Sequence, residues 1–199
     1  MSENREIEEL AASAMDNQAE FDELVEQLSG PSRRRRQRAS AVIGVVARKD
    51  PEKAKSATAA LIDALNRPEA QTRWESLEAL TCLVAVDARS CEKALPGAEA
   101  SLFDEDSGLA HLAAMRFLCK YGATTENRAS KTWPLIDEGL QCYHGDTEFQ
   151  DMLIAVIDYA KGKLPADVKE ELAKRVAFDA NNGKGVLKTR ASQIVANLE

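Results

Sequence analysis

Apolar residues recur along the chain at helical spacing, with polar and charged residues between them. Residues three or four positions apart lie on one face of a helix, so such spacing predicts an apolar stripe. Three stripes are clear: Phe21, Leu24, Val25 and Leu28; Ala39, Val42, Ile43 and Val46; and Leu77, Leu80, Leu83 and Val84. No segment alternates apolar and polar residues long enough to predict a strand. The pattern predicts an all-α protein.

The same pattern returns at a fixed interval of 37 residues. This step carries Leu28 to Leu65 and Leu65 to Leu102, and in the same way Ser76 to Ala113. Steps of 38 and then 40 lead from Ala113 to Asp151 and on to Ala191. A period of this length is typical of repeat proteins, in which each unit buries its apolar face only by stacking on its neighbours. We therefore expect an α-solenoid, a right-handed array of about five antiparallel helix pairs.

The repeat period also predicts how the chain is divided. We expect one domain over residues 1–199, with residues 1–16 as an amino-terminal capping helix. The repeat units are expected at residues 17–50, 51–87, 88–123, 124–162 and 163–199.

Capping residues and helix breakers place the ends of the helices. Asn17, Ser32, Asp50 and Ser107 each precede a helical stretch and can accept a hydrogen bond from its first turn. Pro134 predicts a kink or two short helices within the segment from Thr124 to Gln141. Asn181, Asn182 and Gly183 predict a left-handed helix cap.

An arginine followed three residues later by a small residue opens the second helix of the early units. Arg36 with Ala39 and Arg73 with Ser76 carry this pattern, which resembles the HEAT repeat over residues 17–199. The resemblance implies a curved scaffold whose second helices line a concave surface for macromolecular binding.

Charge is unevenly distributed in a chain of net charge −7. Residues 1–28 hold nine acids and one base, whereas residues 33–55 hold nine bases and two acids. The overall charge argues against general attraction to nucleic acid or anionic membranes. An acidic start and the lack of any apolar run of roughly 20 residues predict a cytoplasmic protein that does not enter the membrane. Cys82 and Cys119 share one repeat position and are expected in the core of a protein kept in a reducing compartment.

The arginine run of residues 33–38 has two interpretations. It is either a basic patch for phosphate or an acidic partner, or an internal feature in which Arg36 is structural and the other arginines meet the acids of residues 3–26. Successive helical positions point about 100° apart, so four consecutive arginines cannot share one surface. The basic patch would comprise Arg34, Arg35 and Arg38, joined by Lys184, Lys188 and Arg190 of the last unit.

One position of the second helices holds large rings in three successive units. Trp74, His111 and Phe149 share this column, and the binding surface that we predict adds Arg73, Glu78 and Met115. These residues either line the concave face or fill the space between repeats as core. Trp74 with Glu78 also faintly resembles the site of HEAT-like alkylpurine DNA glycosylases, although Ala110 stands where that family has an arginine.

The chain lacks motifs for a metal, a cofactor or a reaction. Cys142, His144 and Asp146 are close in sequence but lack the second half of a zinc pattern, and no cofactor is expected. We therefore expect a non-enzymatic scaffold that binds a macromolecule, in the first place a protein. The alternatives are nucleic-acid binding, related to the glycosylases, and self-association through an uncovered terminal repeat.

Overall fold

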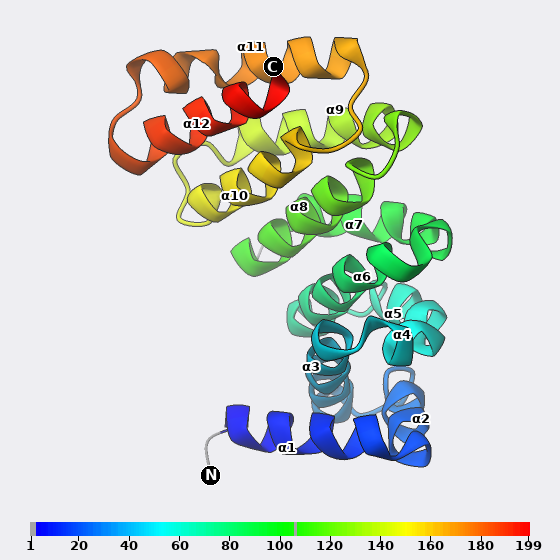
Figure 1. The fold of residues 1–199 in the computed structure, drawn as a ribbon. Helices are drawn as coiled ribbons and strands as arrows, with labels where there is room; N and C mark the ends of the chain where they lie inside the picture. The colour runs from blue at the N-terminus through cyan, green and yellow to red at the C-terminus, as the bar shows by residue number, and fades with distance from the viewer. Residues whose placement is uncertain (1–2, 106) are drawn as a thin grey trace. The chain divides into compact units, whose positions relative to one another are not determined.

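The computed structural model describes residues 3–105 and 107–199 as helices joined by short turns (Figure 1). These ranges contain no strand, which confirms the all-α prediction. None of their helices is long and apolar enough to cross a membrane. The α-helices are α1 (Glu3–Asp16), α2 (Gln18–Gln27), α3 (Arg33–Lys49), α4 (Pro51–Ala54), α5 (Thr58–Ala64), α6 (Ala70–Cys91), α7 (Leu95–Leu102), α8 (Gly108–Gly122), α9 (Glu126–Cys142), α10 (Phe149–Ala160), α11 (Ala166–Asn182) and α12 (Gly185–Leu198). Two short 3-10 helices, η1 (Lys55–Ala57) and η2 (Glu92–Ala94), precede α5 and α7.

The helices are grouped in two compact units, Met1–Ala113 and Ala114–Glu199, with the boundary inside α8. In the first unit α3 packs against α1, α2 and α6, and α5 packs against α6 (Figure 1). In the second unit α12 packs against α10 and α11, and α11 packs against α9. Consecutive helix pairs therefore stack within each unit, as a repeat architecture requires.

Side chains at the helix starts explain where several helices begin. Each of five such residues accepts a hydrogen bond from a backbone N–H two or three residues further on: Asn17, Ser32, Asp50, Ser107 and Thr125. The bond satisfies an N–H that has no partner within the helix. The first four caps were predicted from the sequence and are confirmed, and Pro51 occupies the first turn of α4 directly after Asp50.

The predicted apolar stripes form the interior of the first unit. Ala39, Val42, Ile43 and Val46 of α3 are fully buried, and so are Leu77, Leu80 and Leu83 of α6. Burying one such aliphatic side chain contributes about 1.5–3 kcal/mol. These two stripes supply much of the apolar contact by which α3 and α6 pack in the first unit.

Two local predictions from the sequence are wrong. Helix α9 continues through Pro134 as one helix, so the alternative of two short helices is wrong; its buried face continues on both sides of the proline and offsets the proline's cost of about 3 kcal/mol. Gly183 is extended rather than left-handed, with φ −59° and ψ 168°. Gly185 takes the left-handed conformation instead, at φ 56°, where the chain turns into α12.

The four cysteines are free thiols. Cys119 is buried in the second unit, as predicted, and burial raises the pKa of its thiol. Cys82 is only half-buried, so its predicted place in the core is corrected.

Candidate functional site

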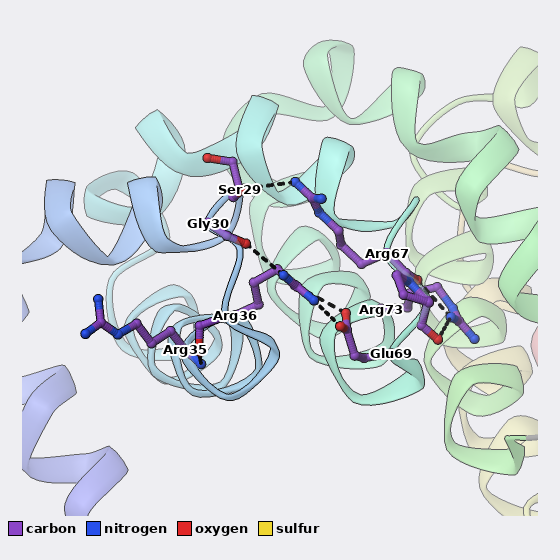
Figure 2. Close-up of polar contacts among 9 residues, drawn as sticks. Ser29, Gly30, Arg35, Arg36, Arg67, Glu69 and Arg73 are labelled. Atoms are coloured by element: carbon purple, nitrogen blue, oxygen red, sulfur yellow. Dashed lines mark hydrogen bonds and ion pairs between the residues drawn. The ribbon is translucent and has the colours of Figure 1, made fainter.

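Arg36 connects two consecutive repeat units from a buried position near the start of α3. Its guanidinium donates to the carbonyl oxygen of Gly30 at 2.7 Å and pairs with the carboxylate of Glu69, just before α6 (Figure 2). The side chains of Arg36 and Glu69 are only 10% and 5% exposed. The hydrogen bond from Arg36 holds the pKa of Glu69 below its ordinary value. Arg36 is therefore structural, as one of the two interpretations of the arginine run expects.

Arg73 repeats this arrangement 37 residues later. Its guanidinium donates to the carbonyl oxygens of Arg67 at 2.9 Å and Pro68 at 2.8 Å, and it pairs with Asp104. The side chain is 13% exposed. The sequence places Arg73 on a binding surface, but its donors are used within the fold, so we correct that assignment.

The predicted aromatic column does not form one exposed surface. Met115 is fully buried and Phe149 is 3% exposed, so neither presents a surface to a partner, and their assignment to a binding face is wrong. Both side chains lie inside the second unit, where apolar burial stabilises the packed helices. Trp74, Glu78 and His111 are half-buried. His111 contacts the carbonyl oxygen of Asp104 through Nε2, which fixes its ring in the turn before α8.

The arginine run points in several directions, as the helical geometry predicts. Arg34 and Arg38 line one groove, whereas Arg35 lies beside Glu23 and Glu26 of α2 in a separate pocket. Figure 2 shows Arg35 extending away from the Arg36 network. The predicted patch of Arg34, Arg35 and Arg38 is therefore corrected, because only Arg34 and Arg38 share a surface.

The groove that holds Arg34 and Arg38 is the candidate functional site, and we call it the α3 groove. It has a volume of about 760 Å³ and is formed by side chains from α1, α3 and α6. Its lining is Asn4, Glu6, Ile7, Glu8, Arg34, Gln37, Arg38, Ala41, Val45, Arg48, Gln71 and Glu75. The six α3 residues recur at intervals of one, three or four, so one helical face provides the floor. Most of the lining side chains are polar, which suits a site for a polar ligand.

Two acids with different surroundings contribute to the electrostatics of the α3 groove. Glu6 of α1 accepts from Arg38 at 2.9 Å, in a pair whose side chains are about half exposed. Glu75 of α6 is half-buried, and burial raises the pKa of its carboxyl, against smaller opposing effects of a hydrogen bond from Trp74 and the charge of Arg48. Gly44 of α3 lies beside Glu75 and Arg48: a Cβ there would make ordinary van der Waals contact, 3.5 Å from Oε2 of Glu75 and 3.7 Å from the guanidinium of Arg48.

Lys184, Lys188 and Arg190, the predicted extension of the basic patch, lie in the second unit. Lys184 is exposed directly before α12. Lys188 donates to the carbonyl oxygen of Asn181 at 3.0 Å, and Arg190 donates to the backbone carbonyl and, at 3.3 Å, to the side chain of Gln150. Lys188 therefore links α12 to the end of α11, and Arg190 links α12 to the start of α10.

Sequence reasoning missed the part of the α3 groove that α6 provides, although the repeat period contained the signal. Gln71 and Glu75 lie 37 residues after Arg34 and Arg38, so they occupy the same positions of the next unit. Residues at one repeat position face the same way in neighbouring units. Extending the arginine positions by one period would have identified both residues.

A metal centre finds no support among residues 3–105 and 107–199, where no three His, Cys, Asp or Glu side chains form a group suited to an ion. His144 instead lies 3.0 Å from the carboxylate of Asp179, and its ring packs on Phe149 with 4.8 Å between the centroids. These contacts anchor the turn before α10 to α11.

Comparison with solved structures identifies the architecture. No protein-family model and no curated protein sequence matches the chain. An engineered protein solved by a structural genomics consortium matches with a TM-score of 0.76 and 14% identity, over 98% of this chain and 87% of that protein. A designed armadillo repeat protein in complex with the peptide (KR)4 matches with a TM-score of 0.76 and 14% identity, over 97% and 91%. An archaeal HEAT-like repeats protein from Thermococcus onnurineus matches with a TM-score of 0.55 and 14% identity, over 96% and 92%. The chain thus has a HEAT/armadillo-like repeat fold, which confirms the resemblance found in the sequence.

Proposed function

We propose that the protein is a non-enzymatic scaffold that binds a polypeptide segment in the α3 groove. The observation that carries this proposal is the groove itself, about 760 Å³ in volume and lined by polar side chains from three helices of the first unit. Volumes of this order are typical of ligand sites in proteins.

The lining of the α3 groove matches the chemistry of a polypeptide. Asn4, Gln37 and Gln71 carry carboxamides, which both donate and accept hydrogen bonds and so can pair with the N–H and C=O groups of an extended chain. Glu75 and Arg48 add charged groups that can distinguish side chains of the ligand. The designed armadillo protein of similar fold holds a peptide, which supports the same use of the fold here.

Nucleic acid is the alternative ligand, and the charges of the α3 groove favour it less. A phosphodiester chain presents one negative charge at every nucleotide. Glu6, Glu8 and Glu75 line the same groove as the arginines and would lie close to such a chain. The resemblance to alkylpurine glycosylases is weakened further because Ala110 is buried where that family has an arginine.

A blocked groove tests the proposal. Peptides that bind the full-length protein would be selected from a random display library and then measured by fluorescence anisotropy with Ala41→Trp, which adds a large ring in the middle of the groove floor. Ala59→Trp is the matched control, because Ala59 is exposed on α5 and does not line the groove. We expect at least tenfold weaker binding to the blocked variant and unchanged binding to the control. Equal binding of both variants, with native circular dichroism, would refute a ligand site in the α3 groove.

A further inference from the structure

Helix α1 places acidic side chains against Arg38 and Lys49 of α3, which we call the basic face of α3. Glu6 pairs with Arg38 at 2.9 Å, and Glu8 pairs with Lys49 at 2.5 Å. The four side chains are 45–54% exposed. Solvent-exposed ion pairs are weak, since water screens them and the long side chains lose freedom. The acids of α1 therefore occupy the basic face without being held there tightly.

The apolar contact beneath α1 is also small. Ala11 and Ala14 are the fully buried residues of this helix among those that the structure describes, and the larger apolar residues Ile7, Leu10 and Met15 are only half-buried. Alanine offers little apolar area, so its burial contributes much less than that of leucine or isoleucine. An exposed acidic helix on a small apolar base is suited to be displaced by a competing ligand.

Positive charge remains in the α3 groove after these pairs are made. Arg34 and Arg48 are exposed, and within the described residues neither forms an ion pair. The charge of Arg48 acts on Glu75 of the same groove, whose partial burial disfavours the charged form of its carboxyl. Guanidinium groups pair well with carboxylates and with phosphates, because two parallel N–H donors match two oxygens of either group. The groove therefore has unused donors for carboxylates.

We propose that the α3 groove binds an acidic polypeptide segment and that α1 is its intramolecular competitor. This inference rests on the proposed function and specifies the partner. Arg34 and Arg48 are separated by about 21 Å along α3, at about 1.5 Å per residue. An extended segment of about six residues covers that length. Such a segment can place carboxylates at both arginines, and its flexible side chains can turn the other carboxylates away from Glu75, which phosphates fixed in the backbone of a nucleic acid cannot do.

Removing the negative charges of α1 tests whether this helix competes with the ligand for the groove, as distinct from a general effect of net charge. The probe is fluorescein-labelled octaglutamate, titrated with the full-length protein at low ionic strength and followed by anisotropy. Glu6→Gln with Glu8→Gln should tighten binding at least threefold, because Arg38 and Lys49 are released. Glu23→Gln with Glu26→Gln is the matched control, since it changes the net charge equally on α2, outside the groove. Equal effects of the two pairs would refute the competition.

A second pair of variants tests the binding residues. Arg34→Ala with Arg38→Ala should weaken octaglutamate binding at least tenfold, whereas Lys184→Ala with Lys188→Ala should leave it unchanged. Labelled octalysine and a 20-nucleotide single-stranded DNA are the competing probes. Tighter binding of either one, sensitive to Arg34 and Arg38, would overturn the assignment to an acidic polypeptide.

The two proposals fail in different ways. If octaglutamate does not bind but selected peptides do, and Ala41→Trp abolishes their binding, the acidic partner is refuted and the scaffold function stands. If no peptide depends on the groove, both proposals fail. Gln71→Trp serves as a second blocking variant should Ala41→Trp not fold.

Discussion

Replacing Arg36 by alanine removes the buried link between two repeat units. Arg36→Ala leaves the carboxylate of Glu69, which is 5% exposed, without its partner, and it removes the hydrogen bond to Gly30. Breaking a buried ion pair by removing one member costs about 3–5 kcal/mol, because the remaining charge stays buried. For a chain of this size we expect the melting temperature to fall by about 6–20 °C.

A graded series relates this cost to burial. Arg73→Ala removes the equivalent pair with Asp104, whose side chains are 13% and 19% exposed, so its cost should be smaller than that of Arg36→Ala. Arg38→Ala removes the exposed pair with Glu6 and should cost about 0–1 kcal/mol. Urea denaturation followed by circular dichroism measures the three free energies of unfolding, and hydrogen exchange at α3 and α6 locates the loss.

The pH dependence gives an independent measure of the same interaction. Arg36 lowers the pKa of Glu69 from its ordinary value of 4.5, so the unfolded chain binds a proton at Glu69 before the folded chain does. The stability that this pair contributes is complete above pH 4.5 and is lost as the pH falls from 4.5 through the lowered pKa. The free energy of unfolding of Arg36→Ala should therefore lack the decrease that protonation of Glu69 causes in the native protein.

A double replacement of Arg36 and Glu69 by methionine should recover part of the stability that Arg36→Ala loses, since it leaves no unpaired charge. The reasoning is refuted if Arg36→Ala lowers the free energy of unfolding no more than Arg38→Ala does. It is also refuted if both variants lose the same free energy of unfolding as the pH falls below 4.5.

Further predictions concern packing and thiol reactivity. Gly122→Ala should destabilise the protein by about 1–3 kcal/mol in urea denaturation, because its Cβ would lie 2.2 Å from Oγ1 of Thr132 and 2.9 Å from the ring of Tyr159. Gly145→Ala, by contrast, would meet no neighbouring atom, and its cost would arise only from a φ of 95°. Among the thiols, Cys142 is exposed and should react with Ellman's reagent in the native protein, whereas Cys119 should react only after unfolding because it is buried and its thiol pKa is raised. If Cys119 of the native protein reacted as fast as Cys142, the burial of the Cys119 thiol in α8 would be contradicted.

The interpretation of the arginine run shows how local geometry limited the sequence analysis. Helical spacing correctly predicted that consecutive arginines diverge, but it could not identify their partners. Glu69 reaches Arg36 from 33 residues away, and Glu6 reaches Arg38 from 32 residues away. Such pairs depend on how helices stack, which is a property of the folded chain.

For the aromatic column, the repeat period predicted a shared position but not the exposure of each side chain. The period of 37 placed Trp74, His111 and Phe149 at one repeat position, but a shared position does not fix exposure. Phe149 is buried while Trp74 and His111 are half-buried, because exposure depends on the packing of each helix and on the turn before it. The shared repeat position therefore did not predict which members of the column are buried.

The sequence by itself determined the helices, their caps and the repeat. Asn17, Ser32 and Asp50 end or begin helices through bonds to their nearest neighbours, and the apolar stripe of α3 follows from a spacing of three and four. These are local properties of the chain. Only the tertiary structure decided that α1 lies against α3, that Arg34 and Arg38 share a groove with Glu75, and that Arg36 is buried. These outcomes depend on contacts between segments distant in sequence, whose energies become defined only when the helices pack together.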